Sequence, residues 1–374
     1  MKFLFSHLYP FHRKWYGGGN QIVRGLALEL TRQGHEAHVS STGRDEMGVT
    51  AADRPVVYHL SGRFDKRTFG VQLAWQTIRL AIRLRPDWVC CLTSEAALVM
   101  PVCNLLKIPA VVYQGAPELP DFRFKGWSTI RTIRYKLGIF LQFLGARAAR
   151  KVTTISDFSS RLAELNWGIP RQKLAMVGTG LDDVFIAPNA PSAGARTDKG
   201  PRFISVGRLT LPQKPLDVMA AALKELPFPW QSWTIVGSGP DEPVLRNRLK
   251  ELGLEERVVF KGTLSSAQIA DMLAEHDIVL LPSNYESFFL TAYEAAAKAR
   301  IIVTNDVADV RKYFSDSPSV IVAESVSGEA YQRAIIQAVE NQGGLEVKAV
   351  RTALRVKNDF SWPVVAERFL RALE

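Results

Sequence analysis

Cysteine is scarce in this sequence of 374 residues, and apolar runs long enough to cross a membrane are missing. The three cysteines, Cys90, Cys91 and Cys103, lie in apolar stretches, and the first two are adjacent. They suit neither a disulfide framework nor a Cys-x-x-Cys metal site. No uncharged apolar segment reaches about 18 residues, and the start MKFLFSHLYPFHRK becomes charged too early for a signal peptide. We therefore expect a soluble protein of a reducing, cytoplasmic compartment.

Repeats of fixed period and low-complexity tracts are also missing, and hydrophobic residues make up 47% of the chain, which excludes disordered and fibrous proteins. The six histidines show no metal-ligand spacing, and no Asp-x-Asp triplet occurs, so we expect no metal cofactor. The triplet Gly17-Gly18-Gly19 before a helical segment differs from G-x-G-x-x-G, which disfavours a nicotinamide cofactor. Its glycines still predict exposed amides at a helix start.

Positive charge is concentrated in the first half of the chain. Residues 1–187 hold 25 Lys and Arg against 14 Asp and Glu, a net charge of +11, whereas residues 188–374 hold 22 against 23. Residues 121–151 alone contain eight basic side chains and one acidic side chain, Asp121. This asymmetry suits a domain that faces a polyanion, and a solubilising surface would explain it equally well.

Short apolar runs alternate with helical patterns on both sides of residues 187–201, a stretch with the Pro, Ala, Gly and Ser content of a linker. Seven strands are expected before this stretch and six after it. The expected helices are residues 20–33, 70–84, 95–106, 129–149, 158–166, 214–225, 241–252, 266–275, 290–299 and 327–341. This pattern predicts an α/β protein with two Rossmann-like domains, residues 1–187 and 188–360, whose parallel sheets face a central cleft.

The segment PSNYESFFLTAYEAAAKA directly follows the apolar strand DIVLL and is the most informative part of the sequence. A helix beginning near Phe288–Leu290 would present unpaired amides and a partial positive charge to an anion. Glu286 would lie in the loop before this helix and Glu294 about one turn inside it, where a carboxylate can bind a vicinal diol such as ribose. Alternatively, Glu286 is a surface residue and Glu294 pairs with Lys298.

Two further loops follow expected strands of the second domain. Arg208 and Lys214, in VGRLTLPQKP, could neutralise a diphosphate and stabilise it as a leaving group, or be plain solvated charges. Gly237 and Gly239, in GSGP, permit close backbone approach to a ligand, or simply form a strand–helix turn.

Taken together, these segments resemble the retaining family 4 glycosyltransferases of the GT-B fold. PSNYESFFLTAYEAAAKA resembles their Glu-x7-Glu signature, VGRLTLPQK their arginine–lysine pair, and GGGNQIVRGLALELTRQGHEAHV their Gly-Gly loop and first helix. FSWPVVAERFL resembles the terminal tryptophan-bearing helix that crosses back onto the first domain, here residues 361–374. The resemblance covers nearly the whole chain in order.

The resemblance implies metal-independent transfer of a sugar from a nucleotide diphosphate sugar to a hydroxyl, with retention at the anomeric carbon. Arg208 and Lys214 would hold the donor diphosphate, Glu294 the ribose, and Glu286 the donor sugar near the reacting centre. The remaining implied contacts are the amides of Phe289, Leu290 and Thr291 to phosphate or sugar, and Gly17 and Gly18 to phosphate or acceptor.

Some positions depart from the family pattern. Phe289 stands where the family often has glycine, so the loop beside the donor sugar is expected to be bulkier than in most members. Gln114 stands where many members place a histidine, and it can hydrogen-bond a hydroxyl but cannot take up a proton. Both glutamates and both cations remain, so we interpret the chain as a divergent, active member.

The basic first domain is the expected acceptor side. An apolar stripe in residues 129–149 is flanked by basic residues, as in a peripheral helix on anionic lipid at the inner face of the cell membrane. The stripe consists of Ile130, Ile133, Leu137, Phe140, Leu141 and Leu144. For the stripe itself, packing on the sheet is the favoured interpretation.

A lipid-linked or cell-surface glycan is therefore the expected acceptor. Two other interpretations stay open: a glycosyltransferase that modifies nucleic acid, which no binding motif supports, and an inactive GT-B partner subunit.

Overall fold

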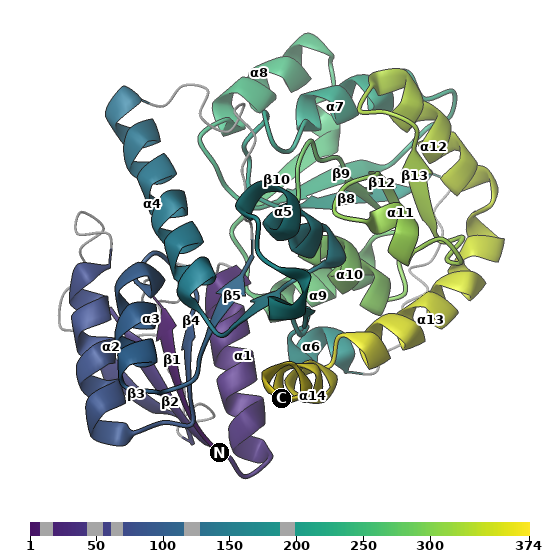
Figure 1. Cartoon of the computed structure of the whole chain (residues 1–374). Helices are drawn as coiled ribbons and strands as arrows, with labels where there is room; N and C mark the ends of the chain where they lie inside the picture. The colour runs from purple at the N-terminus through teal and green to yellow at the C-terminus, as the bar shows by residue number, and fades with distance from the viewer. Residues whose placement is uncertain (8–17, 43–54, 61–69, 116–127, 188–198) are drawn as a thin grey trace. The chain divides into compact units, whose positions relative to one another are not determined.

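The computed structural model describes residues 1–7, 18–42, 55–60, 70–115, 128–187 and 199–374 (Figure 1). The described residues up to Gly180, together with Trp362–Glu374, form one compact unit, and Leu181–Ser361 form the other. The division between them thus lies slightly before the 187/188 boundary expected from composition, and the C-terminal helix belongs to the first unit.

The first unit is built on a seven-stranded parallel sheet of order β3-β2-β1-β4-β5-β6-β7. Its strands are β1 (Lys2–His7), β2 (Glu36–Ser41), β3 (Val57–Leu60), β4 (Trp88–Cys91), β5 (Ala110–Gln114), β6 (Lys151–Thr154) and β7 (Leu174–Met176). Its helices are α1 (Gly18–Arg32), α2 (Val71–Leu84), α3 (Ala96–Leu105), α4 (Thr129–Ala148), α5 (Asp157–Trp167) and α14 (Trp362–Leu373). The central strands are buried along their length, as expected for continuous apolar runs.

The C-terminal helix α14 packs on the first unit through Trp362 and Phe369. The Trp362 ring lies against Gly25 of α1 and Gly180, so closely that a Cβ added at Gly25 would lie 2.0 Å from it. Further along α14, Phe369 contacts the rings of Phe3 and Phe5 on β1. Two glycines therefore make the space into which the last helix docks.

The second unit contains a six-stranded parallel sheet of order β10-β9-β8-β11-β12-β13. Its strands are β8 (Arg202–Val206), β9 (Ser232–Val236), β10 (Val258–Gly262), β11 (Ile278–Leu281), β12 (Ile301–Asn305) and β13 (Val320–Ala323). Its helices are α6 (Asp183–Ile186), α7 (Leu216–Lys224), α8 (Glu242–Glu251), α9 (Ser266–Glu275), α10 (Leu290–Ala297), α11 (Val310–Tyr313), α12 (Gly328–Glu340) and α13 (Gln342–Asp359). Both sheets are parallel and helix-covered, which confirms the predicted fold class.

One expectation about packing is wrong. The apolar stripe of α4 does not pack on the sheet: Ile130, Ile133, Leu137, Phe140 and Leu144 are between 41% and 72% exposed. The opposite face makes the contact instead, because Ile139 and Phe143 pack against the core, and Gly145 lies closely against Ala96 of α3. The helix is apolar on more than one side, so the sequence pattern did not identify the buried side.

No helix among the described residues is long and apolar enough to cross a membrane. The three cysteines are buried and unpaired with one another. Burial raises the pKa of each of the three thiols.

Candidate functional site

Arg208 lies at the carboxyl end of β8, directly after Gly207, and its side chain is exposed. Among the described residues, its guanidinium has no hydrogen-bond or ion-pair partner. A small pocket at the carboxyl ends of β8, β9 and β11 is lined by Gly207, Arg208, Lys214 and Pro282, among others. The two predicted cations therefore border the same pocket, and Arg208 presents an unneutralised charge beside it.

Lys214 reaches across to the loop after β11 and forms an ion pair with Glu286. The Lys214 Nζ lies 2.6 Å from the Glu286 Oε1, and both side chains are about 13–14% exposed. The same Nζ lies 3.9 Å from the centre of the Phe289 ring, in a cation–π contact. Burial lowers the pKa of Lys214, and the negative charge of Glu286 opposes that shift.

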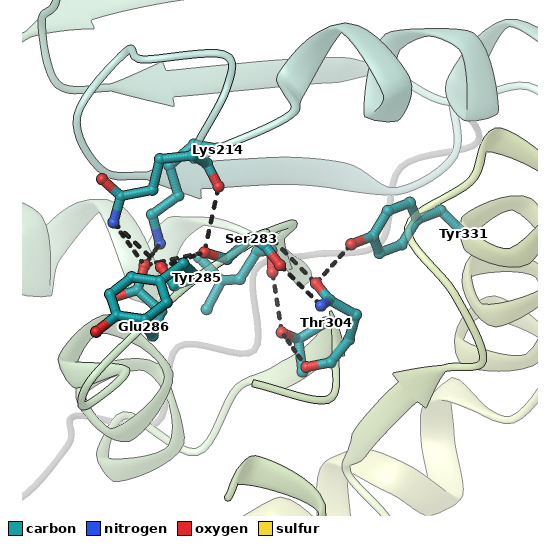
Figure 2. Close-up of polar contacts among 9 residues, drawn as sticks. Lys214, Ser283, Tyr285, Glu286, Thr304 and Tyr331 are labelled. Carbon is teal, nitrogen blue, oxygen red and sulfur yellow. Dashed lines mark hydrogen bonds and ion pairs between the residues drawn. The ribbon is translucent and has the colours of Figure 1, made fainter. Parts of the chain in front are cut away.

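The Oε1 of Glu286 is held by several donors at once (Figure 2). Besides Lys214, the Ser283 hydroxyl donates to it at 3.0 Å and the Gln213 amide at 3.4 Å. No described residue bonds to the second oxygen, Oε2. The carboxylate is thus fixed on one side and has a free acceptor atom on the other, which is what orientation of a substrate hydroxyl requires.

A further set of hydrogen bonds, which the sequence did not predict, fixes the loop that bears Glu286. The Ser283 amide donates to Asn305 Oδ1 at 3.0 Å, and Asn305 Nδ2 donates to the Ser283 carbonyl at 2.8 Å. Tyr331 of α12, fully buried, donates its hydroxyl to the same Asn305 oxygen at 2.7 Å (Figure 2). Three segments distant in sequence therefore determine where Glu286 lies.

Helix α10 begins at Leu290, within the range predicted, and Phe289 precedes it as the N-cap. The Leu290 amide already donates to the Phe288 carbonyl at 2.9 Å, so it is engaged within the protein. Phe289 is 1% exposed beneath Lys214, and its ring packs inside the unit. Thr291, in the first turn, is half-buried. Contacts of these amides to a donor stay a prediction.

Glu294 has an unusual environment for a carboxylate. Burial, with the negative charge of Asp182, raises the pKa of Glu294 to about 8. It does not pair with Lys298, which meets it only through a backbone bond, 3.2 Å from the Lys298 amide to the Glu294 carbonyl. Among the described residues, its carboxyl group has no hydrogen-bond partner. Glu294 is half-buried, and an acid with a raised pKa and no protein partner is typical of a ligand site rather than of a structural position.

Gly237 and Gly239 pack against protein backbone. A Cβ at Gly237, where φ is +130°, would lie 1.8 Å from the Gly207 carbonyl oxygen, and one at Gly239 would lie 2.0 Å from that of Leu209. The Leu209 amide also donates to the Ser238 carbonyl at 3.1 Å. The glycines therefore hold the loop after β9 against the loop that carries Arg208. Ligand contacts by them stay a prediction.

The sites expected in the first unit are only partly visible. Gly17 lies outside the described residues, and Gly18 is the first residue of α1. Gln114, at the carboxyl end of β5, is 1% exposed and donates to the Gln142 amide oxygen at 3.4 Å. Its own Oε1 is buried and has no hydrogen-bond partner among the described residues.

Two family models match the chain side by side. Residues 16–185 match one described as glycosyltransferase family 4, and residues 188–355 match one described as glycosyl transferases group 1. A glycogen synthase of Mycobacterium tuberculosis (strain CDC 1551 / Oshkosh) is 24% identical over 349 residues, which cover 93% of this chain and 80% of that protein.

Solved structures show the same architecture at lower identity. HepE of Anabaena in complex with UDP is 17% identical to this chain and has a TM-score of 0.77. The match covers 100% of this chain and 99% of the HepE chain. The lipopolysaccharide outer core galactosyltransferase WaaB is also 17% identical, with a TM-score of 0.69 and the same coverage.

Proposed function

The chain is a glycosyltransferase of the GT-B architecture, with a family 4 domain followed by a group 1 domain, and we propose that it is a retaining, metal-independent enzyme. Its donor is a nucleotide diphosphate sugar, and its acceptor is a hydroxyl of a lipid-linked or cell-surface glycan. The observation that carries the proposal is the arrangement at the carboxyl ends of β8 and β11, where unpaired Arg208 lies near the Lys214–Glu286 pair.

The two cations bind the diphosphate. As the bond between the anomeric carbon and the β-phosphate oxygen breaks, its electron pair moves onto the phosphate, and Arg208 and Lys214 stabilise the negative charge that develops there. The acceptor oxygen forms the new bond to the anomeric carbon on the same face, and its proton passes to the leaving phosphate. Because these side chains supply the positive charge, no metal ion is needed for this step.

The two glutamates bind the donor at different points. Glu286, fixed through Oε1, offers Oε2 to a hydroxyl of the donor sugar. Glu294, which has no protein partner among the described residues, binds the ribose diol. The two ribose hydroxyls would hydrogen-bond the carboxyl oxygens of Glu294, which have no partner among the described residues.

The experiment is a transfer and donor-hydrolysis assay followed by proton NMR, with a panel of UDP-, GDP-, ADP- and CDP-sugars, with and without EDTA. We expect a product with the anomeric configuration of the donor and a rate that EDTA leaves unchanged. Arg208→Gln is expected to lower kcat/KM at least about a hundredfold, while Arg333→Gln, an exposed arginine of α12 in the same unit, leaves it unchanged. An inverted product, or a rate abolished by EDTA, would contradict the proposed mechanism.

For the acceptor, we propose that α4 places the first unit on an anionic membrane. Five exposed apolar side chains of α4 are accompanied by Arg131, Arg134, Lys136 and Arg147, and the helix contains no acidic residue. Such a face binds lipid through apolar insertion and through attraction to anionic head groups. This supports an acceptor that is delivered at the membrane surface.

Vesicle flotation tests this proposal with a matched pair of variants. The wild type should float with anionic vesicles at low salt, and Arg131→Gln/Arg134→Gln should lose most of that binding. Arg246→Gln/Arg248→Gln removes the same charge from α8 of the other unit and should float like the wild type. Failure of the wild type to float would refute the membrane contact and leave the transferase activity untouched.

A further inference from the structure

A groove on the first unit lies between the edge strand β3 and helix α2, and the proposed transfer reaction does not use it. It has a volume of about 520 Å³. Its wall and floor include His59, Trp75, Gln76, Arg79, Leu80 and Arg83. All of these residues belong to the first unit, whereas Arg208, Lys214, Glu286 and Glu294 belong to the second.

The side chains of one tryptophan, Trp75, and two arginines, Arg79 and Arg83, line the groove. Trp75 is 63% exposed, although large aromatic side chains are usually buried. Arg79 and Arg83 are one helical turn apart and exposed, and neither has a hydrogen-bond or ion-pair partner among the described residues. Helix α2 carries no acidic residue that could neutralise them. The chemistry is that of a ligand with an apolar face and a negative charge.

The polar wall of the groove is fixed by hydrogen bonds within the first unit. Gln76 Nε2 donates to the His59 carbonyl at 2.7 Å, which fixes the side chain, and Gln76 Oε1 is buried without a hydrogen-bond partner among the described residues. His59 is itself held, since its Nε2 lies 3.1 Å from His38 Nδ1 and the two rings stack. Burial first, and then the nearby His38 and Arg83 side chains, lower the pKa of His59. The polar wall is therefore held in place by contacts within the protein.

We propose that this groove binds an anionic sugar residue, with the pyranose ring stacked on Trp75 and a phosphate or carboxylate group held by Arg79 and Arg83. Assignment of this sugar to the acceptor glycan, at a distance from the reacting hydroxyl, rests on the proposed transferase function; the saccharide site itself does not.

A saccharide fits this groove better than a membrane does. The α4 face has five exposed apolar side chains in one stripe, whereas the groove combines one aromatic plate with amides and two cations. Arginine pairs bind phosphate and carboxylate in a directed, bidentate way, which favours a single charged group in a fixed position over a fluid head-group layer.

Titration calorimetry with glucose 6-phosphate, glucuronic acid, glucose and inorganic phosphate tests the proposal on the full chain with UDP present at saturation. The charged sugars should bind more tightly than either glucose or phosphate, and the tighter of the two identifies the anionic group. Arg79→Gln/Arg83→Gln should weaken binding of the preferred charged sugar at least about tenfold, equal to about 1.4 kcal/mol. Trp75→Ala should weaken it similarly and leave phosphate binding unchanged.

Arg246→Gln/Arg248→Gln, which removes the same charge from α8 of the second unit, is the matched control and should bind the charged sugar like the wild type. The proposal is overturned if phosphate binds as tightly as the charged sugars, or if the α2 and α8 variants weaken sugar binding equally. It is also overturned if the α2 variant keeps sugar binding and instead loses vesicle flotation. Absence of binding by UDP, ADP, GDP and CDP alike would contradict the transferase proposal alone, because the groove titration can be repeated without nucleotide.

Discussion

Glu294 is the residue for which the structure makes the sharpest thermodynamic prediction. Its carboxyl group is ionised above pH 4.5 in an unfolded chain, but its pKa in the folded protein is about 8. Between these two values the folded state binds more protons than the unfolded state, so stability falls as the pH rises through this window. Replacement by glutamine keeps the shape of the side chain and removes the titration.

The size of the effect follows from the shift. One pKa unit corresponds to about 1.36 kcal/mol, so ionisation of this half-buried acid destabilises the folded protein by at most roughly 3 kcal/mol at pH 7 and roughly 1 kcal/mol at pH 5. These figures are upper limits, since Glu294 is only partly shielded from solvent. Glu294→Gln should therefore stabilise the protein by up to about 2 kcal/mol more at pH 7 than at pH 5.

Thermal unfolding at the two pH values measures this difference. For a unit of this size, about 2 kcal/mol raises the melting temperature by roughly 4–8 °C. Glu256→Gln, which replaces an exposed glutamate of the same unit, should shift the melting temperature little at either pH. The prediction is wrong if Glu294→Gln raises the melting temperature equally at pH 5 and pH 7, or lowers it at both. Either result would mean that the folded protein does not raise the pKa of Glu294.

The remaining predictions concern packing around the two loops and the last helix. Gly237→Ala should lower the melting temperature by several degrees and weaken nucleoside diphosphate binding, because its Cβ would displace the loop that carries the exposed arginine. Gly25→Ala should destabilise the protein by about 1–3 kcal/mol through its clash with Trp362, whereas Gly343→Ala, with open space around it, should not; urea unfolding compares them. Tyr331→Phe should lower kcat several-fold with an intact fold, seen by circular dichroism, because it removes one hydrogen bond beneath the β11 loop.

Much of the fold could be predicted from local sequence because parallel strands in this protein are continuous apolar runs. The run DIVLLPS, for example, contains the fully buried strand β11, and α10 begins at Leu290 within the expected range. The sequence pattern does not predict helix α13, because Gly343 and Gly344 occupy its first turn and glycine disfavours a helix. Short helices such as α6 and α11 have too few residues to show a period.

The site was predictable in part, since residues that follow strands of one parallel sheet meet at one edge. Arg208, Lys214 and Glu286 lie in loops that follow strands of the second sheet, as expected. Arg208 and Lys214 line one pocket, and Lys214 pairs with Glu286. The contribution of Asn305 and Tyr331 could not be predicted, because it depends on contacts between segments far apart in the sequence. The buried side of α4 was equally beyond reach, since apolar residues occur on both of its faces.

We expect the loops after β8 and β11 to bind a nucleoside diphosphate through Arg208. Titration calorimetry with UDP, ADP, GDP and CDP measures this directly and needs neither the acceptor nor turnover. At least one of them should bind the wild type. Arg208→Gln should weaken its binding at least about tenfold, and Arg333→Gln should bind it like the wild type. Equal affinity of Arg208→Gln and the wild type for every nucleotide that binds would contradict this expectation.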